Sequence, residues 1–208
     1  MGNEREKGGK FRHHVRLRRE ELPVATEALA RYLIGKVLVH EVPGGRLSGR
    51  IVETEAYPPG DASGHAFRGP TPGTRSLYLA PGHAYVYFIY GRYYLLNVSS
   101  EPAGVGAGVL LRALEPLEGI EAMARRRGVT RLVDLARGPG RLTQALGIDK
   151  RHNGIDLCGP GPLWLEAAMP VGEIGVARRI GITRELEQPR RFYEQDSPFV
   201  SGAKRLRE

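Results

Sequence analysis

The sequence predicts a mixed α/β (α+β) fold, in which a single domain combines a curved antiparallel β-sheet, surrounding helices and a protruding β-hairpin. Three observations predict it. The chain has 208 residues, which is enough for one domain with a core and too few for two independent ones. Short strand-like runs follow one another through tight glycine-containing turns, which favours antiparallel neighbours. Segments with apolar residues at helical spacing lie before and after these runs.

The first third of the chain is expected to form a helix and a hairpin. Residues 24–34 follow Pro23, a favourable residue in a first helical turn, and Gly35 stands where a helix commonly ends. The predicted helix presents one apolar face, made by Ala25, Ala28, Leu29, Tyr32 and Leu33. A strand over 36–42, a turn at 43–45 and a strand over 50–57 then predict a β-hairpin.

The strand over 50–57 carries carboxylates on one face. Side chains alternate along a strand, so Glu53, Glu55 and Tyr57 are expected to point the same way. The same alternation places Ile51 with them and gives the other face to small or apolar side chains. A carboxylate is costly to bury without a partner, so this face should border water or a ligand. The strand alone leaves two interpretations open, solvated glutamates on a half-exposed strand or a functional site.

A long connection and an aromatic hairpin follow. Residues 58–81 are rich in Gly, Pro, Ser and Thr, and long connections of this kind are often functional. They carry His65, which on its own is equally compatible with a surface or capping residue. Strands over 85–90 and 93–99 predict a second hairpin with Tyr90 at its tip. Because a hairpin tip is highly exposed, an aromatic side chain there suits insertion into a base stack.

The second half contains a charged residue within an apolar strand. The strand over 109–115 includes Arg112, which needs a carboxylate or a bound ligand opposite it. Glu53 or Glu55 on a neighbouring strand is the expected partner, and a purely structural ion pair is the alternative. Helices are predicted over 116–127, 132–136 and 141–146, and strands over 179–183 and 191–194. Trp164 lies in the segment between the last helix and these strands.

Composition narrows the classes of partner and compartment. The net charge is +8, mostly from arginine, so a polyanion such as nucleic acid is favoured over the alternative of a merely basic protein. The single cysteine, Cys158, excludes internal disulfides and a cysteine-built metal site.

The chain has no apolar run long enough to cross a bilayer and no secretory segment at its start, so we expect an intracellular protein that is not secreted. Residues 1–19 should form a flexible basic tail and residues 203–208 a charged tail, on either side of a domain over 20–202.

Several motifs together resemble one enzyme family. They are Gly49-Arg50-Ile51-Val52-Glu53-Thr54-Glu55-Ala56-Tyr57, His65, Tyr85-Val86-Tyr87-Phe88-Ile89-Tyr90-Gly91, Asn97 and Leu110-Leu111-Arg112-Ala113-Leu114-Glu115-Pro116-Leu117-Glu118-Gly119. The match is extended by Gly138-Pro139-Gly140, Gln144-Ala145-Leu146 and the stretch from Arg191-Phe192-Tyr193 to Ser197-Pro198. In these motifs, which are too long and numerous to recur by chance, the chain resembles the alkyladenine (3-methyladenine) DNA glycosylase family from about residue 20 to residue 201.

The resemblance implies a monofunctional DNA repair enzyme of base excision. Such an enzyme flips an alkylated or deaminated purine (3-methyladenine, 7-methylguanine, hypoxanthine or etheno-adenine) out of duplex DNA. It then hydrolyses the N-glycosidic bond and leaves an abasic site. The resemblance further implies double-stranded DNA as the partner, no membrane, no cofactor and no metal, and we expect a monomer.

The resemblance also assigns roles to individual residues. Matched by position, Glu55 would be the general base that activates water, and Arg112 would help to hold that water. The base pocket would be formed by Tyr57, His65 and Tyr87, with Asn97 in its floor as a discriminator against normal guanine, and Tyr90 would fill the gap left in the stack. The chemistry agrees with these roles, because a carboxylate beside an oxocarbenium-like sugar both orients water and stabilises the positive charge. Tyrosines offset the cost of base flipping and attract a cationic alkylated purine.

The chain also departs from the usual pattern of the family. The departures are Gly64, Gly73, Thr74, Leu77 and Arg92, which surround the predicted pocket loop and hairpin tip. From the residues alone, two other classes stay open, a non-catalytic nucleic-acid binding protein and a hydrolase of free nucleosides. A pure binder gains nothing from a carboxylate paired with an arginine, and the basic charge with an exposed aromatic finger disfavours a free nucleoside as the substrate.

Overall fold

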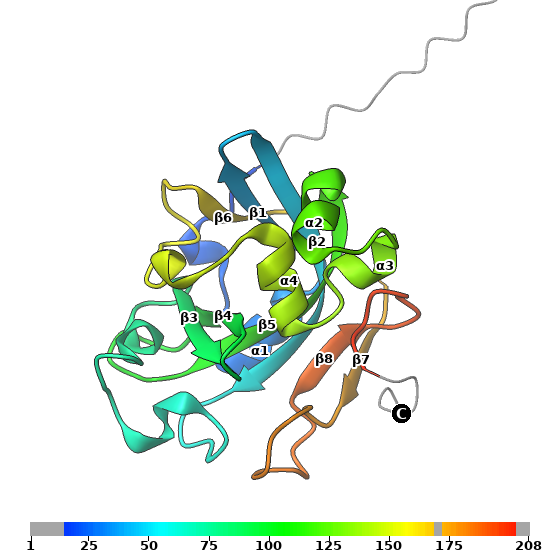
Figure 1. The fold of residues 1–208 in the computed structure, drawn as a ribbon. Coiled ribbons are helices and arrows are strands. Elements are labelled where there is room, and N and C mark those ends of the chain that lie inside the picture. Colours follow the sequence, from blue (N-terminus) through cyan, green and yellow to red (C-terminus); the bar gives the residue numbers. More distant parts are fainter. Residues whose placement is uncertain (1–14, 169–171, 203–208) are drawn as a thin grey trace, which may run out of the picture.

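One antiparallel sheet organises the protein. The computed structural model describes residues 15–168 and 172–202. Within them, strands pair in the order β3-β4-β5-β2-β1-β6, β8 pairs with β2, and β7 pairs with β8, all antiparallel. The strands are β1 (Val37–Val42), β2 (Gly45–Tyr57), β3 (Ala84–Ile89), β4 (Tyr93–Ser99), β5 (Gly108–Glu118), β6 (Leu163–Glu166), β7 (Ile174–Ala177) and β8 (Arg191–Glu194). The sheet curls around the core (Figure 1), so the predicted mixed fold with a curved antiparallel sheet is confirmed.

The helices cover this sheet. Four α-helices are described, α1 (Thr26–Leu33), α2 (Ile120–Arg127), α3 (Leu132–Leu135) and α4 (Pro139–Leu146), with short 3-10 turns η1 (Arg19–Glu21), η2 (His65–Arg68), η3 (Arg75–Tyr78) and η4 (Lys150–His152). α1 packs on β2 and β5, α4 packs on β4 and β5, and α2 lies beside α4 (Figure 1). The helix predicted from residue 116 begins only at Ile120, because β5 continues to Glu118 and Gly119 turns the chain with φ +72°.

The long strand β2 has partners along both edges. Its first residues pair with β1, while Ser48 to Tyr57 pair with β5 and Glu53 to Glu55 also pair with β8. Glu53 and Glu55 therefore lie in the interior of the sheet, between two neighbouring strands. Because strands flank β2 on both sides at this point, the two carboxylates depend on groups from other segments for their hydrogen bonds and ion pairs.

A β-bulge in β2 breaks the simple alternation. Ile51 pairs with Leu114 and Glu53 pairs with Ala113. The chain therefore advances two residues along β2 but only one along β5, which leaves one extra residue in β2. As a result Ile51 belongs to the main hydrophobic core cluster, together with Ala56. The prediction that Ile51 shares a face with the glutamates is therefore wrong, since it assumed a strand without a bulge.

The β3–β4 hairpin extends beyond the sheet. Its two strands pair from Ala84–Val98 to Ile89–Tyr93, whereas β4 pairs with β5 only over Asn97–Ser99. Its outer end has no strand partner other than itself within the described residues, and Tyr90 at the tip is 80% exposed. The protruding hairpin of the prediction is confirmed.

The last third of the chain differs from its predicted elements. β6 passes through Trp164, in a segment for which we predicted no strand, because all four of its residues are buried and do not alternate. The strand predicted over 179–183 lies instead at Ile174–Ala177, while β8 matches its prediction. Residues 179–183 do not continue the strand, because the Arg179 side chain is drawn inward and Gly181 has φ +81°.

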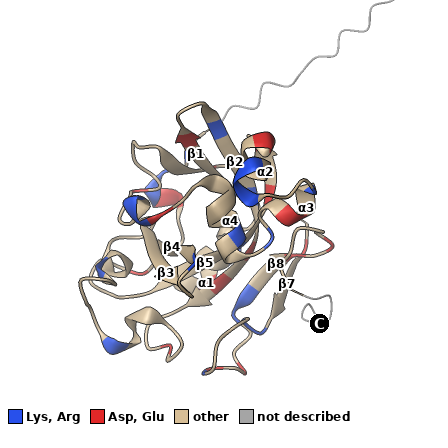
Figure 2. Cartoon of the chain, viewed as in Figure 1, with Lys and Arg blue, Asp and Glu red and all other residues tan. Residues whose placement is uncertain are grey.

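The ends of the chain are described only in part. Residues 1–14 of the predicted basic tail and the predicted tail at 203–208 lie outside the described residues. Residues 15–19 pack on the sheet, where Leu17 is buried and its amide donates to the Leu165 carbonyl at 2.9 Å. In the described chain, no helix combines the length and apolarity that a bilayer crossing requires. Lys and Arg are spread over strands, helices and loops, with Asp and Glu among them (Figure 2).

Candidate active site

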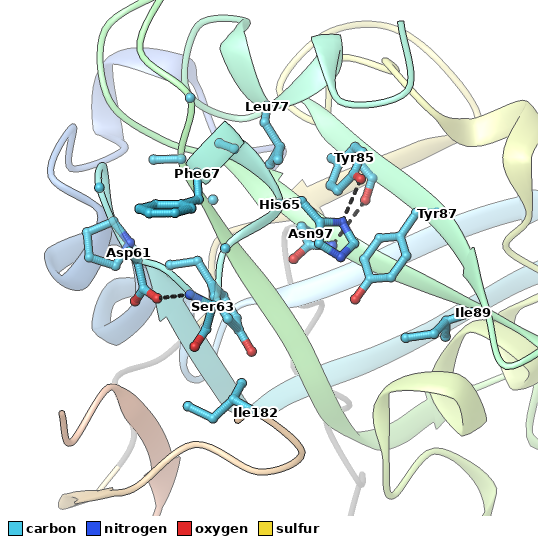
Figure 3. Close-up of a pocket in the computed structure, with 18 of the residues that line it drawn as sticks. Asp61, Ser63, His65, Phe67, Leu77, Tyr85, Tyr87, Ile89, Asn97 and Ile182 are labelled. Carbon is cyan, nitrogen blue, oxygen red and sulfur yellow. Dashed lines mark hydrogen bonds between the residues drawn. The ribbon is translucent and has the colours of Figure 1, made fainter. Parts of the chain in front are cut away.

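A pocket opens beside the β3–β4 hairpin. Its volume is about 150 Å³, and it is lined by the end of β2, the connection with η2 and η3, the hairpin, residues 106–108 and residues 181–182. Figure 3 shows the side chains that surround it, with His65, Tyr85 and Tyr87 close together. The four residues predicted to form the base pocket, Tyr57, His65, Tyr87 and Asn97, all line this pocket. Their roles stay a prediction, but the structure brings them together.

Three rings meet at one wall of the pocket. His65 Nδ1 lies 2.8 Å from the Tyr85 hydroxyl, and the His65 ring meets the Tyr87 ring edge-on with 4.3 Å between centroids (Figure 3). Tyr85 and Tyr87 stack at 5.4 Å because positions two apart share one face of β3. Burial lowers the pKa of His65 and raises the pKa of Tyr85 to about 12, so both are uncharged near neutral pH. An uncharged aromatic wall suits a planar ligand and attracts a cationic one.

Glu55 lies behind Tyr57. The Glu55 carboxylate is fully buried, and its Oε1 accepts a hydrogen bond from the Ile180 amide at 2.7 Å and lies 3.1 Å from Arg112 Nη1. Its Oε2 accepts a hydrogen bond from the Tyr57 hydroxyl at 2.9 Å. Tyr57 lines the pocket, so the Tyr57 hydroxyl connects the pocket with the Glu55 carboxylate.

Burial and pairing act in opposite directions on Glu55. Loss of contact with water favours the neutral acid, whereas Arg112, the Ile180 amide and the Tyr57 hydroxyl stabilise the carboxylate. Burial is the largest effect, so the pKa of Glu55 lies above its ordinary value. A carboxylate of raised pKa accepts a proton more readily, which is the property of a general base.

Arg112 lies between the two carboxylates that the sequence left as alternatives. Its Nε is 3.0 Å from Glu53 Oε1 and its Nη1 is 3.1 Å from Glu55 Oε1, so it pairs with both. Glu53 is held further by Arg191 Nη1 at 3.2 Å and by the Ser201 amide at 2.7 Å, and it does not line the pocket. Both carboxylates are therefore buried and paired rather than solvated. Glu53 ties three segments together, and Glu55 alone of the two is linked to the pocket through a pocket-lining side chain.

Asn97 combines a pocket position with a structural contact. It is 7% exposed, lies on β4 opposite Tyr85, and its Nδ2 donates to the Tyr85 carbonyl at 3.4 Å. Gly108 lies beside it in the pocket lining, where a Cβ would come within 2.8 Å of Leu77 Cδ2. The chain can close the pocket floor at this point because glycine has no side chain.

Tyr90 lies at the hairpin tip, in a turn that disfavours it. Tyr90 and Gly91 have φ values of +54° and +62°, and the Arg92 amide donates to the Ile89 carbonyl at 3.2 Å, as in a type I′ turn. Bulky side chains are rarely found at positive φ. An aromatic residue that is both strained and 80% exposed contributes little to packing, which favours a role outside the folded core.

Sequence reasoning missed four groups in and beside this site. The Ile180 amide is a backbone donor, so no side-chain pattern could have identified it. Tyr85 was available from the sequence, because period-2 alternation places it on the same face as Tyr87. Asp61 and Arg179, a buried pair beside the pocket, were also not assigned, since they are 118 positions apart in the chain.

The fold and the site together define a class of enzyme. A curved sheet carries a buried, arginine-paired glutamate behind a tyrosine-lined pocket, and an exposed tyrosine projects from the neighbouring hairpin. These are residues to which the resemblance assigned a site in a DNA glycosylase, and their individual roles stay a prediction.

Comparison with known proteins identifies the family. The family model described as methylpurine-DNA glycosylase (MPG) matches residues 20–198, and the chain belongs to this family. A protein of Mesorhizobium japonicum is 60% identical over 196 residues, which are 94% of each chain. A protein of Paraburkholderia phytofirmans is 55% identical over 192 residues, covering 91% of this chain and 90% of that one. Both carry 3-methyladenine DNA glycosylase in their names. The predicted family and the predicted enzyme class, a DNA glycosylase of base excision repair, are confirmed, and the non-catalytic binding protein is not supported.

Proposed function

We propose that this protein removes alkylated or deaminated purines from duplex DNA by hydrolysis of the N-glycosidic bond. The proposed substrates are purines of the 3-methyladenine, 7-methylguanine, hypoxanthine and etheno-adenine type. The enzyme acts on double-stranded DNA as a monofunctional glycosylase and as a monomer, and it leaves an abasic site. The observation that carries the proposal is the Glu55 carboxylate, buried and paired, one hydrogen bond away from the base pocket.

Entry of the base is the first step of the proposed reaction. A damaged purine rotates out of the stack, which costs a few kcal/mol, least where the base is already poorly paired. The Tyr87 ring and the His65 ring stack against it in the pocket, and Asn97 meets its minor-groove edge. Tyr90 occupies the gap that the base leaves in the duplex, for which its exposed position on the hairpin is suited.

Glu55 then acts on water at the anomeric carbon. In its ionised form it accepts a proton from the attacking water at Oε2, and its negative charge stabilises the oxocarbenium-like sugar. Arg112 and the Ile180 amide hold Oε1, so that Oε2 is the oxygen directed toward Tyr57 and the pocket. The pair of electrons in the glycosidic bond leaves with the purine, which departs readily when alkylation has made it cationic.

The decisive experiment changes Glu55 to Gln. Glu55→Gln keeps the size of the side chain and removes the base, so binding to lesion DNA should be retained. Single-turnover excision should fall about 10²–10⁴-fold, the usual contribution of a positioned base. Glu53→Gln is the matched control, because it makes the same change at the other carboxylate paired with Arg112. We expect it to lower the melting temperature and to keep excision by the folded fraction within about tenfold of the unmodified enzyme. Excision by Glu55→Gln at the level of this control would rule out the proposed base.

A further inference from the structure

Arg179 is a buried charge to which the proposed reaction gives no role. Its side chain is fully buried behind the pocket, on the segment that follows β7. Nη1 donates to Asp61 Oδ2 at 2.6 Å and to the Ala56 carbonyl at 3.0 Å. Its guanidinium carbon lies 4.6 Å from the centroid of the Tyr57 ring. Arg179 therefore joins the end of β2, the connection that leads to His65, and its own segment.

Hydrogen bonding alone does not account for the position of this guanidinium. Arginine carries five N–H donors in a planar fork, and buried donors are normally satisfied. Nε and Nη2 of Arg179 are buried and have no hydrogen-bond partner within the described residues. The contact over the Tyr57 ring is what this orientation achieves in their place, and a lysine there would keep the charge and lack the planar guanidinium that makes it. The orientation of the Tyr57 ring is thus coupled to that of Arg179.

Two of the partners of Glu55 lie next to this contact in the chain or belong to it. The Tyr57 hydroxyl donates to Glu55 Oε2, and the amide of Ile180, the residue next to Arg179, donates to Glu55 Oε1. We propose that Arg179 is a positioning residue, which holds the Tyr57 hydroxyl and the Ile180 amide in place on Glu55 without touching the substrate. This role rests on the proposed function, in which Glu55 is the base.

Loss of Arg179 has a consequence for protonation. Both hydrogen bonds favour the carboxylate form of Glu55 and oppose the effect of burial, so weakening them raises the pKa of Glu55 further. Because excision needs the carboxylate, the fall in rate at low pH then begins at higher pH. The substitution leaves the other charged or titratable side chains around Glu55 in place, namely Glu53 and Tyr57 on β2, Tyr87 on β3, Arg112 on β5 and Arg191 on β8.

The test is the pH profile of single-turnover excision by Arg179→Met. This change keeps a long apolar side chain and removes both the charge and the planar fork. We expect the plateau rate to fall about ten- to a hundredfold and the acid limb to move up by about one pH unit, the equivalent of one weakened hydrogen bond to a charged group. Arg179→Lys should show the same shift to a smaller extent, because it keeps the charge and loses the planar guanidinium.

Arg190→Met is the matched control. Arg190 Nη1 also pairs with Asp61 Oδ2, at 2.9 Å, while its Nε pairs with Glu27 at 2.9 Å, and the guanidinium over the Tyr57 ring is that of Arg179. Arg190→Met should lower the melting temperature and leave the acid limb of the pH profile where it is in the unmodified enzyme. If Arg179→Met and Arg179→Lys lower only the melting temperature, as this control does, Arg179 is purely structural and the proposal is overturned.

A second measurement serves if Arg179→Met does not fold. In a Tyr57→Phe background the effect of Arg179→Lys should shrink, because the hydroxyl that Arg179 positions is already missing. Equal effects in the two backgrounds overturn the positioning role. If Glu55→Gln abolishes excision while the Arg179 variants follow the unmodified enzyme, only the positioning role fails. If Glu55→Gln excises normally, the proposed function itself fails.

Discussion

Replacement of Tyr90 by asparagine is expected to move stability and activity in opposite directions. At φ +54° an L-residue with a bulky side chain is disfavoured by roughly 1–2 kcal/mol, whereas asparagine tolerates this conformation. The Tyr90 side chain is 80% exposed, so its removal sacrifices little packing. Tyr90→Asn should therefore raise the free energy of unfolding by about 1 kcal/mol, seen as a rise in Tm of roughly 2–4 °C for a chain of this length.

The same substitution should weaken capture of the flipped nucleotide. An aromatic side chain stacked on a base contributes about 1–3 kcal/mol, which corresponds to roughly a 5- to 150-fold loss. The assay compares single-turnover rates on two duplexes, one with the lesion opposite its normal partner and one with the lesion in a mismatch. The mismatched base is easier to flip, so Tyr90→Asn should lower the excision rate less on the mismatched duplex than on the paired one. Phe88→Ala, a change at a half-exposed aromatic residue of the same hairpin, should leave the ratio of the two rates unchanged.

Two results would refute this reasoning. A lower Tm for Tyr90→Asn would show that the tyrosine packs on the hairpin and that its φ stores no strain. Equal losses on the paired and mispaired duplexes would show that Tyr90 does not fill a gap in the stack.

Two further predictions concern the pocket. Asn97→Ser should raise excision of guanine-derived lesions relative to hypoxanthine, because guanine carries an exocyclic amino group on the minor-groove edge that the asparagine would crowd; an unchanged or lower ratio of single-turnover rates would make Asn97 a structural residue. For the unmodified enzyme, the rate should fall as pH falls through the raised pKa of Glu55, since only the carboxylate accepts a proton, so the fall should begin above the ordinary value of 4.5. A rate that stays constant down to that pH would contradict the assignment of Glu55.

Most of the fold could be predicted because its signals are local. The turn at residues 43–45 and the turn at Gly91 join segments that alternate with period two, and both hairpins form where these signals place them. Helices end at Gly128 and Gly147, which adopt positive φ. β6 escaped prediction because a short, fully buried strand has no periodicity to distinguish it.

The residue types of the site were also available from the sequence. The resemblance named Tyr57, His65, Tyr87 and Asn97 as one group, and the pocket is lined by all four. The apolar surroundings of Arg112 called for a carboxylate opposite it, and the ion pairs bear this out. Such inferences succeed because a buried charge restricts its own neighbours.

Only the tertiary structure decided how these groups are held. The bulge in β2 turns Ile51 into the core, and a second register shift, between Glu53 and Thr54, lies where Arg112 of β5 meets the two glutamates. Both irregularities depend on pairing with β5, more than fifty residues away in the chain. The Ile180 amide and the Arg179 guanidinium reach the same place from the far end of the sequence. Their contacts depend on the three-dimensional packing of segments distant in sequence, whereas turns and alternation follow from the conformational preferences of neighbouring residues.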